Sequence, residues 1–421
     1  MEVLRIRGGR PLSGRLQVQG AKNSVLPLLA AAILGRGVSA IHNCPRLTDV
    51  DASVAILEHL GCEVRWEGDT LYIDAAAPHA YTVPASLARA MRSSVIFLGP
   101  ILARLGRAEM SYPGGCELGP RPIDLHLSAL RTLGAEIQEG PAGLVCAATA
   151  LRGGEITLTI PSVGATENAM LCAVAAGGIT TILNAAREPE IVQLQDFLRS
   201  MGAQVRGAGS SVITIWGGEM LHGGEVTVMG DRIVAATYLC GCAAAGGEVE
   251  LAGVESRHLS TVTALLAEAG CAVESSEGRI RLSRDPDLPL RCVHAVRTAP
   301  YPGFPTDAQA PLMAALCTAQ GTTLFVENMF SSRYRHIDEL RRMGASINCE
   351  GRVAVVTGVE RLHGGELEAF DLRGGAALAV AALGATGESV ITGLHHVLRG
   401  YADIARDLTA LGADAEILEK K

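Results

Sequence analysis

The sequence predicts an α/β protein of two domains, each made of three similar units with apolar helices inside and sheets outside. Three observations carry this prediction. The chain of 421 residues is too long for one ordinary core. Its 48% hydrophobic and 19% charged residues are typical of a globular protein with ample core. A short phrase, and the helix and strand around it, recur along the whole chain.

The recurring phrase is an apolar helix end, a glycine, and then a strand. The glycine is typical of a helix C-terminus, where a left-handed backbone conformation is needed. The copies follow one another at intervals of about 70 residues and lie at 60–64, 133–137, 201–205, 269–273, 343–347 and 411–415.

A second pattern recurs with the same spacing: an Ala/Leu-rich helix ends in Gly and is followed by a β-branched strand. Each unit therefore reads βαβαββ, with a first helix that is apolar nearly all round and a second that is amphipathic. We expect the apolar helices at Asn23–Leu34, Ser93–Leu105, Ala165–Ala176, Ile233–Ala245, Ala308–Ala319 and Ala376–Ala385. The strands after them include Val38–Ile41, Thr180–Leu183, Val249–Leu251, Thr322–Val326 and Ser389–Ile391.

The domain boundary is expected near Gly230-Asp231, between the third and fourth units. The opening strands, 3–7 and 16–19, should belong with the last three units, because the sixth copy ends without its final strand. The predicted domains are therefore 21–230, which carries a loop around Cys116, and 1–20 together with 231–421.

Composition excludes several classes of protein. A net charge of −8 and only 4% aromatic residues argue against a nucleic-acid partner. The chain has no long apolar run and no signal-peptide pattern at its start, so we expect no membrane partner and a cytoplasmic location. Eleven cysteines without a Cys-x-x-Cys pair indicate reduced thiols and no structural metal site. The sequence does not determine the oligomeric state.

The segment 111–126 is the strongest single candidate for function. It is rich in Gly and Pro, which excludes a helix or a central strand and predicts a loop. The loop carries Cys116, and Arg121 follows five residues later. An arginine beside a thiol favours thiolate formation or anion binding.

Cations stand at the starts of several predicted buried helices, where the helix dipole disfavours them. For Arg232 we favour a structural salt bridge, whereas Lys22 and Arg373 indicate an anionic ligand. Loop arginines Arg333 and Arg399 at equivalent repeat ends add to a site for a multiply charged substrate. The chain lacks the phosphate-binding motifs of P-loop and Rossmann proteins.

Taken together, these sequence motifs resemble those of the enolpyruvyl transferases over essentially the whole chain. The similarity is greatest to the branch whose acceptor is UDP-N-acetylglucosamine and which begins peptidoglycan synthesis. The resemblance implies two inverse α/β barrel domains, each of three βαβαββ repeats, with the active site in the interdomain cleft. The matching motifs lie at 20–23, 91–94, 113–116, 119–126, 162–166, 186–191, 297–300, 304–307, 371–373 and 399–401.

The resemblance also implies roles for individual residues. The small-molecule substrates would be phosphoenolpyruvate and UDP-N-acetylglucosamine, with no metal and no cofactor. Phosphoenolpyruvate would contact Lys22 and Asn23. Arg121 and Arg399 would share its phosphate with Lys22, and Arg333 and Arg373 would hold its carboxylate. UDP-N-acetylglucosamine would contact Arg92, Arg121, Pro122, Ile123, Asp124, Leu125, Ser162, Val163, Gly164, Asp307 and Met329.

The implied catalytic residues are Cys116, Asp307, Lys22 and Arg399. An ordinary thiol has a pKa of about 8.5 and is mostly protonated at neutral pH, so Cys116 can deliver a proton to C3 of the enolpyruvyl group. Asp307 is the candidate base for the sugar hydroxyl, although at a helix start it could instead be only an N-cap. The cations would stabilise the departing phosphate.

The chain departs from the family pattern at two positions, and two alternative functions stay open. Some family members have a lysine where this chain has Ile160, and Met329 stands where a smaller residue can occur. The sister enzyme that makes 5-enolpyruvylshikimate 3-phosphate shares the fold and the phosphoenolpyruvate site. A non-catalytic paralogue that binds a UDP-sugar is the other alternative.

Overall fold

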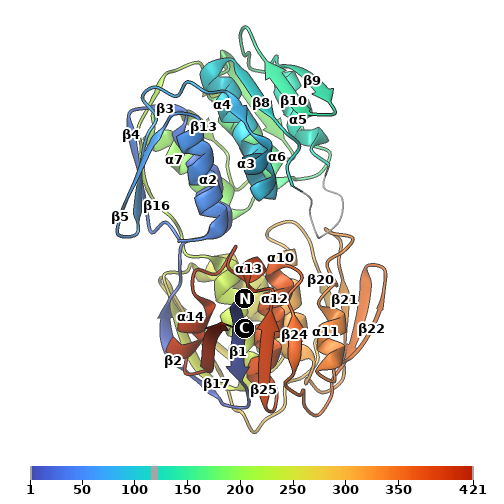
Figure 1. Ribbon diagram of the computed structural model, residues 1–421. Coiled ribbons are helices and arrows are strands. Elements are labelled where there is room, and N and C mark those ends of the chain that lie inside the picture. Colours follow the sequence, from blue (N-terminus) through green and yellow to red (C-terminus); the bar gives the residue numbers. More distant parts are fainter. Residues whose placement is uncertain (1, 115–121, 420–421) are drawn as a thin grey trace. The chain divides into compact units, whose positions relative to one another are not determined.

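A computed structural model describes residues 2–114 and 122–419. By their internal contacts these residues form two compact units (Figure 1). We call residues 20–114 with 122–229 the central unit, and residues 2–19 with 230–419 the terminal unit. The boundaries expected from the sequence, 21–230 and 1–20 with 231–421, stay a prediction about independently folding domains.

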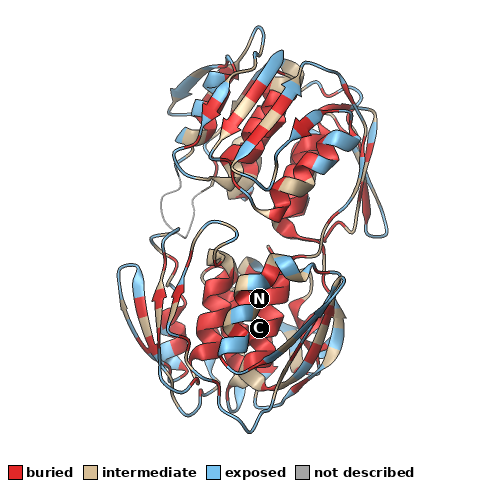
Figure 2. Cartoon of the chain, turned by 180° about the vertical axis from the view of Figure 1, so that it is seen from behind, coloured by how far each residue is buried: buried red, intermediate tan, exposed pale blue. Residues whose placement is uncertain are grey.

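Apolar helices form the interior of the central unit. They are α1 (Lys22–Ala32), α6 (Val163–Ala173), and α4 (Leu98–Leu105), which continues the 3₁₀ turn η1 (Arg92–Phe97). Nearly every residue of α1 and of α6 is buried, and Figure 2 shows red, buried residues on the helices inside the sheets. This confirms the prediction that the helices that are apolar all round lie inside.

Three four-stranded sheets surround these helices. Their strand orders are β16-β4-β6-β5, β7-β8-β10-β9 and β11-β12-β14-β13. The strands are β4 (Val38–His42), β5 (Glu63–Glu67), β6 (Thr70–Asp74), β7 (Thr82–Val83), β8 (Arg107–Met110), β9 (Glu136–Gly140), β10 (Gly143–Ala147), β11 (Glu155–Thr157), β12 (Gly178–Leu183), β13 (Gln204–Arg206), β14 (Val212–Gly217) and β16 (Glu225–Thr227). Because β16 pairs in parallel with β4, the last strand of the unit closes its first sheet. A small parallel pair joins β3 (Gly35–Arg36) to β15 (Leu221–His222).

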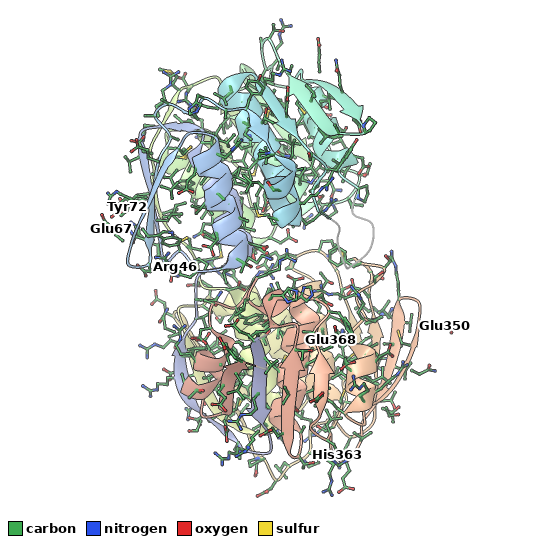
Figure 3. All side chains as sticks on the ribbon, viewed as in Figure 1. Arg46, Glu67, Tyr72, Glu350, His363 and Glu368 are labelled. Carbon is green, nitrogen blue, oxygen red and sulfur yellow. The ribbon has the colours of Figure 1, made fainter. Side chains whose placement is uncertain are left out.

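Further helices of the central unit are α2 (Thr48–His59), α3 (Ala85–Ala90), α5 (Asp124–Thr132) and α7 (Pro189–Ser200). The hairpin β5–β6 carries charged and aromatic side chains, among them Glu67 and Tyr72, on the side away from α2 (Figure 3). The guanidinium of Arg46 lies 3.4 Å from the centre of the Trp66 ring. Trp66 pairs with the buried Leu71, so this contact lies on the other face of the hairpin from Glu67 and Tyr72.

The terminal unit repeats the plan with α8 (Arg232–Ala245), α10 (Thr306–Leu316) and α12 (Leu372–Gly384), which pack against one another. Its sheets have the orders β18-β19-β17-β2, β20-β21-β23-β22 and β24-β25-β1-β26. The strands are β1 (Glu2–Arg7), β2 (Leu12–Gln17), β17 (Gly247–Ala252), β18 (Ala272–Ser276), β19 (Arg279–Arg284), β20 (Ala295–Arg297), β21 (Thr322–Val326), β22 (Ser346–Glu350), β23 (Val353–Thr357), β24 (Glu366–Glu368), β25 (Glu388–Thr392) and β26 (Asp414–Glu419). The outer helical segments are η2 (Ser256–Leu259), α9 (Ser260–Glu268), α11 (Ile337–Arg342), α13 (Leu394–Val397) and α14 (Ile404–Ala410).

The first strand of the chain completes the last sheet. Strand β1 lies between β25 and β26 and is antiparallel to both, and β2 runs parallel to β17. Leu4 and Ile6 of β1 are fully buried. Six sheets of the same order around buried helices confirm the predicted fold of two inverse α/β units with three repeats each.

Two helices differ from the sequence prediction at their starts. The helix expected over 93–105 is a 3₁₀ turn, η1, followed by α4. The helix expected from Ala376 begins at Leu372, because Asp371 caps it by accepting from the N–H groups of Arg373 and Gly374.

Candidate active site

A carboxylate held by two arginines lies at the start of α10 in the terminal unit. Arg333 Nη2 donates to Asp307 Oδ1 at 2.7 Å, and Arg373 Nη2 donates to Asp307 Oδ2 at 3.1 Å. The two arginine side chains are 2% and 3% exposed, whereas that of Asp307 is 26% exposed. The Asp307 carboxylate is therefore partly exposed to solvent, whereas the two guanidinium groups that bind it are buried.

Arg333 is placed by the segment that follows β21. Glu327, which is fully buried, accepts from the hydroxyls of Thr298 and Thr306 and from the backbone N–H groups of Met329 and Phe330. Arg333 itself donates from Nη2 to the Thr306 carbonyl at 3.0 Å. These bonds tie the segment that carries Arg333 to the first turn of α10.

Arg373 lies in the first turn of α12. Burial is the largest influence and opposes its charge, but Asp307, Tyr401 and Asp231 together outweigh burial, so the pKa of Arg373 is raised and the guanidinium stays charged. A cation at a helix N-terminus is unfavourable with respect to the helix dipole. Asp307 supplies the compensating negative charge, and Arg373 Nη1 also donates to the Tyr401 hydroxyl at 3.5 Å.

Lys22 opens α1 in the central unit and pairs with a carboxylate. Its Nζ lies 2.7 Å from Asp49 Oδ2, and the two side chains are 11% and 3% exposed. Asn23 follows as a half-buried residue. The ammonium of Lys22 is therefore positioned by Asp49 of α2, a residue that the sequence analysis did not single out.

A second group in the central unit joins the starts of α5 and α6. A Cβ at Gly164 would lie 3.0 Å from Cε1 of His126, so the two helix starts touch. His126 Nδ1 lies 3.1 Å from Asn168 Nδ2, which makes Nδ1 the acceptor. Burial, reinforced by the charge of Arg92, lowers the pKa of His126 to about 4. The imidazole is therefore neutral near pH 7.

Among the expected acceptor-binding residues, Pro122 and Asp124 are exposed, and Ile123 and Leu125 are half-buried. Ser162 caps α6 by accepting from the N–H of Ala165 at 3.4 Å. Ile160 is 59% exposed and Met329 is 37% exposed. The structure thus brings the segments 122–126 and 162–164 to one place in the central unit.

The remaining predicted site residues lie in different parts of the chain. Cys116 and Arg121 lie outside the described residues. Arg399 is half-buried just after α13. Asp307 is not the N-cap of α10, because the cap position is Pro305. Of the expected site residues, Asp307, Arg333 and Arg373 are in direct contact.

The sequence analysis assigned no role to Asp49, Glu327 or His126. Asp49 and Glu327 are single carboxylates whose sequence neighbourhoods carry no charge pattern that would separate them from solvated residues. His126 belonged to a recognised motif, but its contact with Asn168 spans 42 positions and needs the fold to appear.

The arrangement in the terminal unit can bind an anion and accept a proton. Two buried guanidinium groups provide planar donors that match a carboxylate. Asp307 is accessible enough to reach a substrate hydroxyl. Within the ranges 2–114 and 122–419, no cluster of three or more His, Cys, Asp and Glu residues is arranged to hold a metal ion.

Comparison with known proteins gives the class of this fold and site. The family model described as EPSP synthase (3-phosphoshikimate 1-carboxyvinyltransferase) matches residues 6–408. The crystal structure of the enolpyruvyl transferase NikO from Streptomyces tendae superposes with a TM-score of 0.89 and 27% identity, over 99% of this chain and 98% of that one. The EPSP synthase structure from Acinetobacter baumannii has a TM-score of 0.74 at 20% identity over the whole of both chains, which shows the fold alone.

Curated relatives are similar over nearly their whole length. UDP-N-acetylglucosamine 1-carboxyvinyltransferase 2 of Caldanaerobacter subterraneus subsp. tengcongensis is 47% identical over 98% of this chain and 99% of its own. UDP-N-acetylglucosamine 1-carboxyvinyltransferase 1 of Symbiobacterium thermophilum is 49% identical over 97% of this chain and 93% of its own. The chain belongs to the enolpyruvyl transferase family and is a transferase.

Within the described part of the chain, no helix combines the length and the apolar character needed to cross a bilayer.

Proposed function

We propose that this protein transfers the enolpyruvyl group of phosphoenolpyruvate to the 3-hydroxyl of UDP-N-acetylglucosamine and releases phosphate. The observation that carries the proposal is the 47–49% identity, over nearly full length, to relatives named for this activity. The reaction is the first committed step of peptidoglycan synthesis, so it serves cell-wall growth and division.

The reaction proceeds by addition and then elimination. The sugar 3-oxygen bonds to C2 of phosphoenolpyruvate as its proton leaves, and C3 gains a proton. Loss of phosphate from C2 and of a proton from C3 then restores the double bond. We assign removal of the hydroxyl proton to Asp307 and delivery of the C3 proton to Cys116.

Charge placement supports the remaining assignments. Arg333 and Arg373 hold the carboxylate of phosphoenolpyruvate, because both are buried and present planar N–H edges. Lys22, Arg121 and Arg399 take the phosphate and stabilise it as it departs, and Asn23 also contacts phosphoenolpyruvate. The acceptor contacts Asp307 and Met329 in the terminal unit, and its central-unit contacts are Arg92, Arg121, Pro122, Ile123, Asp124, Leu125, Ser162, Val163 and Gly164.

Phosphate release tests this proposal directly. Phosphoenolpyruvate is supplied alone, with UDP-N-acetylglucosamine, and with shikimate 3-phosphate. Release that depends on the UDP-sugar is expected. Release only with shikimate 3-phosphate would make the chain the sister enzyme, and tight UDP-sugar binding without release would make it a non-catalytic paralogue.

The reaction is placed in the cytoplasm. The ten cysteines that the structure describes are free thiols, eight of them buried, which fits a reducing compartment. Fluorescence microscopy of a tagged protein checks this location.

A further inference from the structure

A chain of hydrogen bonds runs from Arg373 into the core of the terminal unit. Arg373 Nη1 lies 3.5 Å from the Tyr401 hydroxyl, which lies 2.7 Å from Thr237 Oγ1. Thr237 Oγ1 in turn lies 3.0 Å from the Ile233 carbonyl. Arg373, Tyr401 and Thr237 are 2%, 0% and 2% exposed. Three polar side chains from three segments are therefore connected out of contact with water.

The direction of each bond in this chain follows from the donors available. Thr237 has one hydroxyl proton, which it gives to the Ile233 carbonyl, so its oxygen accepts from Tyr401. Tyr401 then has no further proton, and its oxygen accepts from Arg373, whose guanidinium can only donate. Burial raises the pKa of Tyr401, so the phenol keeps the proton that it donates.

The contact with Tyr401 uses the one nitrogen of Arg373 that does not bind Asp307. Nε and Nη2 donate to Asp307 Oδ2 at 3.3 and 3.1 Å. A carboxylate can bind this same Nε–Nη2 edge of Arg373 in a planar, two-bond geometry. When the edge is shared with a substrate, the Nη1 contact still holds the plane of the guanidinium.

We infer that Tyr401 and Thr237 are positioning residues, which orient Arg373 so that its Nε–Nη2 edge presents to the carboxylate of phosphoenolpyruvate. This inference rests on the proposed function. Neither residue touches the reacting atoms: both act through Arg373. Misdirection of this one edge weakens phosphoenolpyruvate binding and leaves the acceptor contacts in the central unit unchanged.

The chain offers a matched control beside Tyr401. Tyr238 is also fully buried, and the two rings meet edge to face with centroids 6.3 Å apart. Its hydroxyl donates to Asp407 Oδ2 at 2.9 Å, so it is connected to α14 instead of Arg373. Tyr401→Phe and Tyr238→Phe each remove one buried, hydrogen-bonded hydroxyl and keep the ring.

The first experiment compares steady-state phosphate release and urea unfolding for wild type, Tyr401→Phe and Tyr238→Phe. Tyr401→Phe is expected to raise the KM for phosphoenolpyruvate about tenfold, the scale of one hydrogen bond to a charged group, with little change in kcat. The KM for UDP-N-acetylglucosamine should stay the same. Tyr238→Phe should lower stability to a similar degree and leave both KM values unchanged. Equal phosphoenolpyruvate KM values in the two variants would overturn the inference.

A second experiment uses Thr237, so that a poorly folding Tyr401→Phe does not stop the test. Thr237→Val removes the acceptor for Tyr401 and should raise the KM for phosphoenolpyruvate. Thr237→Ser keeps the hydroxyl and should have the same KM for phosphoenolpyruvate as wild type. The double variant Tyr401→Phe/Thr237→Val should resemble Tyr401→Phe alone, because both changes break one chain. The inference would be overturned if the double variant multiplied the KM increases of the two single variants. It would also be overturned if Thr237→Val and Thr237→Ser had the same KM for phosphoenolpyruvate.

The two proposals fail separately. If wild type releases no phosphate with both substrates present, the proposed function is wrong before any variant is compared. If wild type turns over and the KM for phosphoenolpyruvate is the same in all variants, only the positioning role is wrong.

Discussion

Asp307 is bound by the two arginines that the proposed reaction needs for phosphoenolpyruvate. Each of its oxygens accepts from a different buried guanidinium, which is also how a substrate carboxylate would be held. The proposed roles therefore predict that Asp307 competes with the substrate carboxylate for Arg333 and Arg373, and that substrate binding frees Asp307 to accept a proton.

Replacement of Asp307 by asparagine should have opposite effects on turnover and on binding. Turnover should fall roughly 10²–10⁴-fold, the usual worth of a general base. Phosphoenolpyruvate should bind more tightly and raise the melting temperature more than in wild type, because two buried cations have lost their carboxylate. Titration calorimetry and thermal unfolding measure both.

Asp338→Asn is the control for this prediction, because it removes the same charge from an exposed pair with Arg341. It should change neither turnover nor binding. Weaker phosphoenolpyruvate binding in Asp307→Asn than in this control would contradict the competition.

Cys116 lies outside the described residues, and its role is predicted from the sequence. Cys116→Ser should lose roughly 10²–10⁴-fold in rate, because a hydroxyl is far too weak an acid to replace the thiol. Cys116→Asp should retain activity with the alkaline limb of its rate profile, where the proton donor ionises, at lower pH, and should resist fosfomycin, an epoxide that alkylates this thiol in the family. Phosphate release against pH, with and without the epoxide, measures this. A fully active Cys116→Ser would refute the proton-donor role.

At the scale of elements, helix α6 carries a buried acid. Glu167 is 5% exposed, and burial, together with the charges of Glu190 and Glu188, raises its pKa to about 8. A carboxyl with a raised folded-state pKa stabilises the fold fully below its unfolded pKa of about 4.5, and this contribution is lost as the pH rises through about 8.

Glu167→Gln should remove that pH dependence. Its free energy of unfolding relative to wild type should increase between pH 5 and pH 8, because glutamine does not ionise. Urea unfolding at the two pH values measures the difference. Glu136→Gln, at an exposed position of β9 in the same unit, serves as the control and should show no such change. A parallel pH dependence in wild type and Glu167→Gln would show that Glu167 ionises normally in the fold.

At the scale of the whole molecule, strands from the start of the chain join sheets formed by its last part. The central unit closes with its own strand β16, whereas the terminal unit needs β1 and β2 from the start of the chain. Removal of β1 would leave β25 and β26 without their shared neighbour and would take the buried Leu4 and Ile6 out of the core.

Expression of the two units as separate chains tests this dependence. Residues 20–229 should fold alone and unfold cooperatively. Residues 230–421 should fail to fold alone, and should fold when residues 1–19 are fused before them through a flexible linker. Circular dichroism and urea unfolding report the result. A folded 230–421 fragment would show that β1 is dispensable.

The sequence alone determined the repeat, the class of its helices and most of the residue types of the site. Periodicity reports which faces of an element are apolar, so helices such as α1 and α6 were recognisable as buried. Motifs around Lys22, Asp307 and Arg373 carried the family resemblance because their residue types are local in the chain.

Only the tertiary structure decided which side chains meet. The partners of Arg373 are Asp307, 66 positions away, and Tyr401, 28 positions away, and no local pattern specifies such contacts. The start of α12 depended on the cap by Asp371. These contacts arise when separate repeats pack their helix starts together, because pairing and burial are properties of the packed core.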